Sequence, residues 1–487
     1  MSIKINQLEP VEVWSRFAEL NAVPRASKKE EKVQAFIESF AHNLGLPYHR
    51  DEVGNIIIRK PATQGATSKK PIILQAHIDM VHQKNNDTIF DFDTQGIDMY
   101  VDGDWVKARG TTLGADNGLG VACIMAILAS SDIEHPAIEA LFTIDEETGM
   151  TGALGLKGGI LHGKILLNLD TEDDDEIDIG CAGGLDVTAE KNYETIVSPM
   201  INIGKKIEVK GLKGGHSGMD IHKGLGNSNK IMNRLLYNLT INLGGMIHSI
   251  DGGSLRNAIP RESTAIISIH PDQDQAFLSK FEEIKNQLLL EYEYIEPNLE
   301  ISIQEEKNPG QAMDPIEEIQ LVKAIYSAHN GVYKMSPNID GLVEASNNVA
   351  RVEVKNGKAR ILNLTRSSVE SSKWDVANSL KSTFELGGFE VSFSGDYPGW
   401  SPNVKSEILK ISAEIYKKLN HTEPRIVACH AGLECGILGR NYPGLDMISF
   451  GPTIKGAHCP DERASISSLQ KFWIFLKEVL KNIPEDK

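Results

Sequence analysis

The sequence is poor in cysteine and in basic residues, and both shortages exclude classes of protein. Its five cysteines form no CxxC pair and no spacing typical of a disulfide framework, so we expect reduced thiols and a cytoplasmic protein. Its 50 Lys and Arg residues are outnumbered by 67 Asp and Glu residues, which gives a net charge of −17. Nucleic acids and anionic membranes bind basic surfaces, so neither is expected as a partner.

Long apolar segments are also missing. The first residues, "MSIKINQLEP", lack the apolar core of a signal peptide, and the longest apolar stretch, near "VACIMAILA", is too short to cross a bilayer. A hydrophobic fraction of 41% and a charged fraction of 24% are instead typical of a soluble globular protein. Because 487 residues exceed what one ordinary core holds, we expect two or three domains.

Both ends of the sequence carry the pattern of an α/β domain. Almost wholly apolar runs predict strands that are buried on both faces of a sheet, at residues 55–60, 71–77, 139–145 and 164–170. The segment 118–131 predicts a helix between two of these strands. The segment 27–46 predicts another helix, which begins with a capping box of Ser27 and Glu30. The same character returns near the C-terminus, so residues 1–186 and 399–487 together predict one discontinuous, layered α/β domain.

The middle of the chain has a different pattern. Residues 205–304 predict the order strand, helix, strand, strand, helix, strand, which is one compact two-layer unit. Residues 315–395 repeat this order without its first strand. We therefore expect an inserted α+β domain at residues 187–398, made of two ferredoxin-like halves at about 200–308 and 312–398.

Residues of the types that bind metals recur at the ends of the predicted strands. His77 and Asp79 end one strand and should point to the same face, because strand side chains alternate. The other candidates are Asp116 in "GADNG", Glu146 and Glu147 in "TIDEETG", Asp170 in "LNLDTED" and His458 in "GAHCPDE". In an open α/β sheet, ligand sites collect beyond the carboxyl ends of the strands. Imidazole and carboxylate groups gathered at that edge suit two divalent ions such as zinc.

Each of these patterns also has an ordinary explanation when it is taken alone. His77 with Asp79 can be a simple hydrogen-bonded pair, and Glu146 with Glu147 can be a solvated acidic turn. His216, among the glycines of "GGHSG", can be a surface residue beside a turn. The occurrence of all five strand-end motifs in one chain is harder to explain in this way, and it favours the metal site.

Eight short segments carry a resemblance to a known family. "HIDMV", "GADNG", "DEETG", "NLDTE" and "GAHCPDE" resemble, in this order, the motifs of the M20 family of metallopeptidases. "GGHSGMDIHKG", "SLRNAIP" and "CHAGLECG" are similar to the aminoacyl-histidine dipeptidase branch of that family. The resemblance covers nearly the whole chain. Its one departure is Cys459, where relatives often carry serine, and this affects no expected ligand.

The resemblance implies a role for each strand-end residue. Metal ligands are expected to be His77, Asp116, Glu147, Asp170 and His458, with Asp116 bridging two divalent ions. The ions would be Zn²⁺, with Co²⁺ or Mn²⁺ as alternatives that accept the same ligands. Asp79 would orient His77 through its other ring nitrogen. Glu146 would be the general base that activates the attacking water. The family also implies a cis peptide bond after Asp116.

The inserted domain is expected to act as a lid. The resemblance makes His216 and Asn257 donors to the oxyanion, and it places backbone groups near Gly432 in the substrate cleft. Arg366, at the end of a predicted strand, is expected to bind the C-terminal carboxylate of the substrate. In single-lid relatives the lid histidine comes from a partner subunit. Two lid halves would let one chain supply both the lid histidine and the arginine, and a homodimer is the alternative arrangement.

The expected function is metal-dependent hydrolysis of dipeptides, preferentially Xaa-His dipeptides such as carnosine. One alternative keeps the two-metal site but makes the protein an aminoacylase or deacetylase of N-acyl amino acids. Another is a metal-dependent binding protein without catalysis. Glu146 speaks against the last alternative, because a binding protein has no use for a base beside its ligands.

Overall fold

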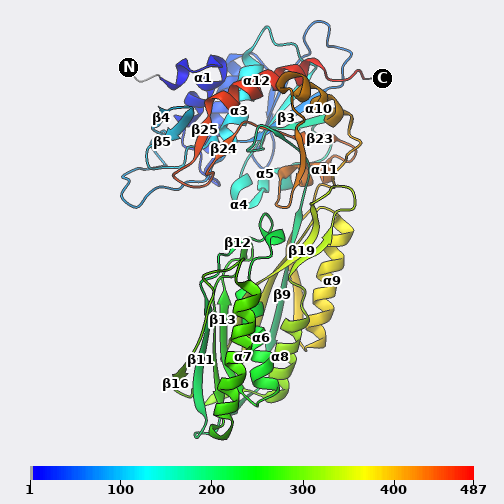
Figure 1. Cartoon of the computed structure of the whole chain (residues 1–487). Helices are drawn as coiled ribbons and strands as arrows, with labels where there is room; N and C mark the ends of the chain where they lie inside the picture. The colour runs from blue at the N-terminus through cyan, green and yellow to red at the C-terminus, as the bar shows by residue number, and fades with distance from the viewer. Residues whose placement is uncertain (1–3, 487) are drawn as a thin grey trace. The chain divides into compact units, whose positions relative to one another are not determined.

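The computed structural model describes residues 4–486, which fall into two compact units (Figure 1). The first unit contains Met1–Gly180, Trp400–Ala428 and Leu433–Lys487. The second unit contains Cys181–Gly399 and Cys429–Gly432. The second unit is therefore an insertion into the first, as the change of pattern along the sequence suggests.

The first unit is built on a mixed eight-stranded sheet. Its strands, in spatial order, are β1 (Tyr48–Arg50), β2 (Ile56–Lys60), β6 (Ile138–Thr143), β3 (Ile72–His77), β7 (Ile165–Asn168), β23 (Asp446–Ser449), β8 (Glu176–Cys181) and β22 (Arg425–Cys429). The neighbours β6, β3, β7 and β23 are parallel. Every residue of β3, β6 and β7 is buried, which explains why their sequences are almost wholly apolar.

Helices and a small second sheet complete this unit. The helices are α1 (Val11–Asn21), α2 (Glu31–Asn43), α3 (Ala115–Ala129), α4 (Glu146–Gly149), α5 (Thr151–Gly155), α10 (Glu407–Asn420), α11 (Glu434–Asn441) and α12 (Ile466–Lys481). The small sheet has the order β24 (Ile454–Lys455), β25 (Arg463–Ser465), β5 (Trp105–Ala108) and β4 (Met99–Asp102). The mixed α/β class predicted from the sequence is confirmed.

The predicted capping box is wrong. Helix α2 begins at Glu31, and Glu30 at its N-terminus makes no side-chain cap. Instead, Glu30 Oε1 accepts a hydrogen bond from the backbone N–H of Lys28 at 2.8 Å. The hydroxyl of Ser27 donates to Asp79 Oδ2 at 2.8 Å. The local pattern gave the wrong prediction because the Ser27 hydroxyl, which was expected to cap the helix, hydrogen-bonds to Asp79 instead.

The second unit is a nine-stranded sheet covered by helices. Eight strands follow in the order β16 (Glu300–Glu306), β11 (Ile203–Lys210), β15 (Ser263–Ile269), β13 (Met246–Gly253), β19 (Val343–Lys355), β20 (Lys358–Ser367), β9 (Gly183–Asn192) and β21 (Glu390–Tyr397), and β18 (Gly331–Met335) pairs with β19. The helices are α6 (Ser228–Leu236), α7 (Asp274–Tyr292), α8 (Pro315–Ser327) and α9 (Glu370–Leu386). Buried residues of sheet and helices, Phe277, Phe281 and Phe384 among them, form one continuous core.

The sheet consists of two halves with the same topology. One half is β11–α6–β13–β15–α7–β16, and the other is β9–α8–β19–β20–α9–β21. Each half places its first strand between its third and fourth strands. The halves join where β13 pairs antiparallel with β19, from Ile250↔Val354 to Gly253↔Arg351. The first strand that the second repeat lacked in the sequence is thus β9, which precedes the whole first half.

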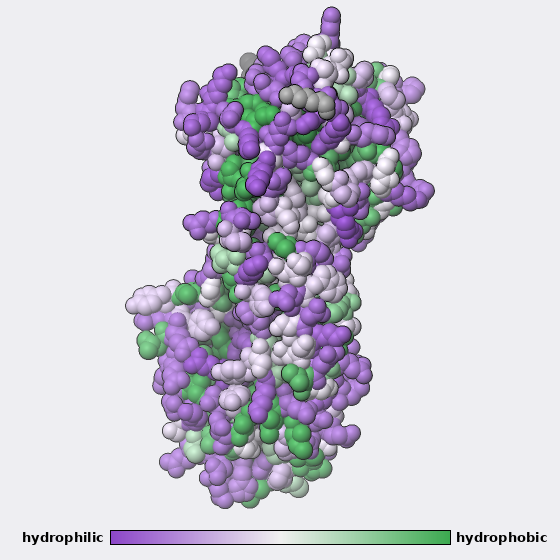
Figure 2. All heavy atoms as spheres, turned by 90° about the vertical axis from the view of Figure 1, so that its right-hand side faces the viewer, coloured by the Kyte–Doolittle hydropathy of each residue, from purple (hydrophilic) through white to green (hydrophobic). Residues whose placement is uncertain are grey.

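The surface is largely hydrophilic on the face drawn in Figure 2, with apolar residues scattered among polar ones. This agrees with the charged composition of the chain. Within residues 4–486, none of the helices has the length and apolar character that crossing a membrane would require.

Candidate metal centre and active site

The parallel strands of the first unit deliver four of the candidate residues to one edge of the sheet. His77 is the last residue of β3, Glu146 and Glu147 open α4 after β6, and Asp170 follows β7. The carboxyl ends of parallel strands meet at the same edge, so side chains far apart in sequence become neighbours. Asp116 near the start of α3 and His458 in the loop between β24 and β25 complete the group. We call His77, Asp116, Glu147, Asp170 and His458 the Asp116 cluster.

Asp116 is shared by two groups of potential metal ligands. Ligand atoms of His77, Asp116 and Asp170 lie within 4.8 Å of one another, as do those of Asp116, Glu147 and His458. Asp116 Oδ1 is 3.2 Å from His77 Nε2, whereas Asp116 Oδ2 is 3.1 Å from His458 Nε2. Each carboxylate oxygen therefore faces a different imidazole, which is the arrangement that a carboxylate bridging two cations requires. The peptide bond from Asp116 to Asn117 is cis, as the family resemblance implied.

Asp79 organises the end of β3. Its Oδ1 lies 3.2 Å from His77 Nδ1 and accepts from the backbone N–H of Glu146 at 3.1 Å. Its Oδ2 accepts from the hydroxyl of Ser27 at 2.8 Å and from the N–H of Glu147 at 3.3 Å. A carboxylate beside Nδ1 favours the proton on that nitrogen and leaves the lone pair of Nε2 for a metal. Asp79 thus lies where it could orient His77, and its hydrogen bonds hold the turn that carries both glutamates.

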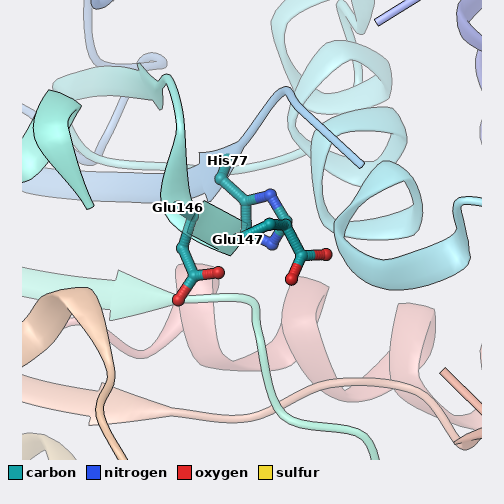
Figure 3. Close-up of side chains that lie close together, drawn as sticks. All are labelled: His77, Glu146 and Glu147. Atoms are coloured by element: carbon teal, nitrogen blue, oxygen red, sulfur yellow. The ribbon is translucent and has the colours of Figure 1, made fainter. Parts of the chain in front are cut away.

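Glu146 and Glu147 are neighbours in sequence but differ in their surroundings. In Figure 3 their carboxylates lie on either side of the His77 ring, and ligand atoms of all three residues fall within 4.8 Å. Glu147 Oε2 is 3.0 Å from His458 Nε2, and Glu147 Oε1 is buried without a hydrogen-bond partner in the part of the chain that the structure describes. A buried oxygen left in this way fits a carboxylate whose partner is a cation.

The carboxylates of the site make it favourable for positive charge. Burial lowers the pKa of His77, but Asp170, Asp116 and Asp79 outweigh it and hold that pKa well above its ordinary value. Asp116 and Glu147 raise the pKa of His458 to about 11. The carboxylates therefore raise the pKa of both imidazoles, and divalent ions bound by the same groups would offset the same negative charge.

The carboxyl of Glu146 has the environment of a proton acceptor. Burial raises its pKa well above the ordinary value of a glutamate, and Asp170, Glu434 and Glu147 raise it further, while His77 lowers it. Glu434 was missed in the sequence, although it lies inside the quoted motif "CHAGLECG". Its Oε2 accepts hydrogen bonds of 2.6 Å from Gln75 Nε2 and from Thr143 Oγ1, so it is fixed against the strands below the site.

The second unit brings His216 and Asn257 together on a two-stranded ribbon. His216 ends β12 (Gly215–His216) and pairs with Ala258 of β14 (Ala258–Ile259), next to Asn257. The N–H of Ser217 donates to Asn257 O at 2.8 Å. His216 Nδ1 accepts from the N–H groups of Gly218 and Met219 at 3.3 and 3.1 Å, so a neutral ring carries its proton on Nε2. Burial and then Arg366 lower the pKa of His216, which favours this neutral, donating form.

Arg366 is a buried guanidinium without a carboxylate partner. Its side chain, in a residue only 4% exposed, donates to Tyr397 Oη at 2.8 Å and to Ser217 Oγ at 3.4 Å, and its Nη2 lies 3.5 Å from His216 Nε2. Burial raises the pKa of Asp186 and the positive charge of Arg366 partly offsets this, but Asp186 forms its ion pair with Arg256 instead, with 3.1 Å between Asp186 Oδ2 and Arg256 Nε. No carboxylate in residues 4–486 forms an ion pair with Arg366. We call His216, Ser217, Arg366 and Tyr397 the Arg366 cluster.

The segment around Gly432 brings another imidazole, that of His430, close to Arg366. Gly432 itself lies half-buried in the loop between β22 and α11. His430, two residues before it, places Nε2 2.8 Å from Ser346 Oγ, next to Arg366 across the β19–β20 register. Burial lowers the pKa of His430 to about 3, and Arg366 and His216 contribute to the decrease. His430 and Tyr397 were both missed in the sequence: His430 lies inside a quoted motif, whereas no local signal marks Tyr397.

The chain is similar to proteins of known family over almost its whole length. A family model described as "Peptidase family M20/M25/M40" matches residues 73–482. The cytosol non-specific dipeptidase of Escherichia coli (strain K12) is 42% identical over 481 residues, covering 99% of each chain. The crystal structure of aminoacylhistidine dipeptidase from Vibrio alginolyticus is 42% identical and superposes with a TM-score of 0.94, covering 100% of this chain and 99% of that one.

More distant structures share the fold alone. Aminopeptidase PepT from Bacillus cereus ATCC 10987 is 15% identical, with a TM-score of 0.57 over 98% of this chain and 99% of that one. The match of the family model, the full-length identity to the E. coli relative and the order of the motifs agree. The chain belongs to peptidase family M20/M25/M40.

Proposed function

We propose that the protein is a cytoplasmic metallo-dipeptidase that hydrolyses dipeptides, preferentially Xaa-His dipeptides of the carnosine type. The observation that carries the proposal is the position of Asp116 between two imidazole–carboxylate groups, with the carboxyl of Glu146 beside them. Membership of a metallopeptidase family implies divalent metal ions, and two relatives that are 42% identical are named as dipeptidases. The compartment is proposed from the name of the E. coli relative.

Two ions, Zn²⁺ with Co²⁺ or Mn²⁺ as alternatives, would be held by the Asp116 cluster. One position is formed by His77, Asp116 and Asp170, and the other by Asp116, Glu147 and His458. When bound, the ions supply the Lewis acidity that lowers the pKa of water and polarises the scissile carbonyl. Imidazole and carboxylate groups at these distances fit zinc chemistry.

Glu146 would move the proton during hydrolysis. Its carboxylate takes a proton from the attacking water and passes it to the nitrogen of the leaving amine. Burial raises the pKa of Glu146, which makes its carboxylate a stronger base towards the water proton. Asp79 contributes by keeping the tautomer and orientation of His77, so its role is positioning.

The Arg366 cluster would recognise the substrate. The Nε2–H of His216 and the side chain of Asn257 donate to the oxyanion of the tetrahedral intermediate, and backbone groups near Gly432 line the substrate cleft. Arg366 binds the C-terminal carboxylate in a bidentate fork, because a buried guanidinium without a counter-ion lacks the partner that such groups require. A longer peptide would place its carboxylate out of reach, so the enzyme selects dipeptides by length.

One chain supplies both recognition groups under this proposal. His216 belongs to the half that contains β11–β16, and Arg366 belongs to the half that contains β9 and β20, yet they approach to 3.5 Å within one chain. Mixing His216→Ala protein with Glu146→Gln protein should therefore restore no activity. Recovery of activity after subunit exchange would mean that a partner subunit in a homodimer supplies the histidine.

The proposed reaction is tested by amine release from carnosine, other Xaa-His dipeptides and N-acetylated amino acids, each with and without a chelator. We expect hydrolysis of the dipeptides alone, loss of activity with the chelator and recovery with added Zn²⁺, Co²⁺ or Mn²⁺. Cleavage of N-acetylated amino acids in preference to dipeptides would replace this proposal with an aminoacylase. Chelator-resistant dipeptide hydrolysis would contradict the metal-dependent mechanism.

A further inference from the structure

The turn that carries Asp116 is held by an unusual number of buried polar contacts. Glu462, which is 2% exposed, accepts four backbone N–H groups in succession. Its Oε2 accepts from Leu113 at 2.7 Å and Gly114 at 2.9 Å, and its Oε1 accepts from Ala115 at 2.7 Å and Asp116 at 3.2 Å. The first N–H groups of a helix have no partner within the helix, and here one carboxylate accepts those of Ala115 and Asp116 together with those of the two residues before the helix.

The same turn is held from its carbonyl side by Arg25. This arginine is fully buried and donates to Gly114 O at 2.5 Å, to Asp79 O at 3.0 Å and to Ile78 O at 3.2 Å. It therefore connects the turn before Asp116 with the segment that follows His77. Burial lowers the pKa of Arg25 to about 10, while Glu462 and Asp79 raise it, so the group stays charged near neutral pH.

Two glycines of the Asp116 motif make room for this guanidinium. A Cβ atom at Gly114 would lie 2.4 Å from Arg25 Nη2, and one at Gly118 would lie 2.6 Å from the same atom. Gly114 also has a φ of +70°, which favours glycine in its own right. The glycines of "GADNG" are thus explained in part by a residue almost ninety positions earlier in the chain.

We propose that Arg25 and Glu462 are positioning residues that set metal affinity by fixing the orientation of the Asp116 carboxylate. Asp116 must present one oxygen to each of two metal positions, so a small rotation of its turn would spoil both. Glu462 fixes the amides of that turn, and Arg25 fixes its carbonyl and the strand end beside it. The inference rests on the proposed metal site, but it concerns metal affinity and not the identity of the substrate.

The first experiment is Glu462→Gln, measured as Zn²⁺ affinity in competition with a chromogenic chelator. Glutamine keeps the shape but turns an NH₂ group towards two backbone N–H donors, so one acceptor atom and its two hydrogen bonds are lost and donor faces donor. We expect Zn²⁺ binding about 10–100-fold weaker, the range found when an outer partner of a metal ligand is lost. An unchanged Zn²⁺ affinity would overturn the proposal.

A matched control separates positioning from general stability. Glu296 in the second unit is also 2% exposed, and its two oxygens accept from the N–H groups of Lys213 and Gly226 at 2.8 and 2.9 Å. Glu296→Gln should lower thermal stability but leave Zn²⁺ affinity unchanged. Equal losses of Zn²⁺ affinity in Glu296→Gln and Glu462→Gln would show a structural effect only and would refute the positioning role.

Arg25→Lys tests the other side of the turn. Lysine keeps the charge but cannot span three carbonyl groups with a planar fork, so Zn²⁺ affinity should fall here too. If circular dichroism shows that Glu462→Gln does not fold, Arg25→Lys becomes the decisive test. Normal Zn²⁺ affinity of Arg25→Lys would then overturn the proposal.

The unmodified protein offers a test that needs no variant. In chelator-treated wild-type protein, hydrogen exchange should show the amides of residues 113–116 still protected, because Glu462 and not the metal accepts them. Rapid exchange of these amides would contradict the proposal. Failure of the dipeptidase proposal would look different: Zn²⁺ affinity would respond to Glu462→Gln as expected while no dipeptide is hydrolysed by the wild type.

Discussion

The Asp116 cluster and the Arg366 cluster are both assembled from distant segments, but their charges are opposite. The first gathers three carboxylates around two imidazoles, and these carboxylates raise the pKa of both imidazoles. The second gathers a buried guanidinium and a neutral histidine around hydroxyl groups, with no carboxylate paired to Arg366 in the described residues. The charges of the Asp116 cluster therefore favour binding of cations, and those of the Arg366 cluster favour binding of an anion.

Under the proposed function, the two clusters have complementary tasks. Divalent ions would bind to the first, and a substrate that carries a carboxylate would bind to the second. A dipeptide has a scissile carbonyl for the ions and a C-terminal carboxylate for the guanidinium. Changes in the first cluster should therefore act on metal binding or on the chemical step, and changes in the second should act on the choice of substrate.

The largest expected effect comes from Glu146→Gln. The amide keeps the shape of the side chain but cannot accept the proton, so kcat should fall by about 100–10,000-fold while metal content stays normal. Glu147→Gln is the matched control, since it should lower metal content instead. Metal analysis of both purified variants, together with kcat, separates them. The opposite pattern would reverse the two roles.

Arg366→Ala should have the next largest effect, and only on substrates with a free carboxylate. Hydrogen bonds to charged groups are worth about 1.5–3 kcal/mol each, so losing a bidentate pair should lower kcat/KM for a dipeptide acid by about 100-fold or more. The same dipeptide with an amidated C-terminus should lose far less. Arg360→Ala, which removes a surface arginine of β20 paired with Glu190, is the control and should change neither. Equal losses of kcat/KM on the dipeptide acid and on its C-terminal amide would show that Arg366 does not bind the substrate carboxylate.

Asp79→Ala should weaken metal binding or activity by about 10–100-fold, the usual result of removing the partner of a metal-bound histidine. The measurement is metal affinity by competition, with kcat at saturating metal. Asp104→Asn serves as a control in the same unit, because Asp104 accepts from Ser465 and Ser467 and touches no expected ligand. A variant of Asp79 with normal affinity and normal rate would mean that His77 needs no orienting partner.

The smallest expected effect is that of Tyr397→Phe. The ring stays, but Arg366 loses the hydroxyl that accepts from it at 2.8 Å. Tyr397 would position the guanidinium without binding the substrate itself, so we expect a loss of only about 0.5–1.5 kcal/mol. KM for a dipeptide acid should then rise by about 2–10-fold with little change in kcat. The amidated dipeptide should be unaffected. A fall in kcat on both substrates would place Tyr397 outside carboxylate recognition.

The Asp116 cluster could be predicted from the sequence more fully than the Arg366 cluster. Within the Asp116 cluster, His77, Glu147 and Asp170 lie at or just after the ends of apolar strands. Asp116 lies in a Gly-rich turn before a helix, and His458 lies in a loop after a strand. Parallel strands bring their carboxyl ends together, so local patterns were enough to predict a shared site. The capping box failed because Ser27 bonds to Asp79, a partner 52 positions away.

The Arg366 cluster has no such local pattern. Arg366 and Tyr397 are 31 positions apart, and Arg366 and His216 are 150 positions apart. Antiparallel pairing of β20 with β9, and the insertion of one half between β9 and α8, decide which of these residues meet. The missing first strand of the second repeat was invisible for the same reason, since β9 precedes the other half in the chain.

The sequence by itself therefore determined the α/β class and the family, and it predicted the chemical types of the expected metal ligands, because these depend on hydrophobic periodicity and on short motifs. The tertiary structure alone decided that Glu462 and Arg25 hold the Asp116 turn and that Glu434 raises the pKa of Glu146. It also decided that Arg366 forms no ion pair with a carboxylate within residues 4–486. Each of these depends on a balance of charge and hydrogen bonds within a buried volume. Such a balance is a property of which groups meet in space, and contacts between residues separated by tens to hundreds of positions leave no spacing that a local pattern can reveal.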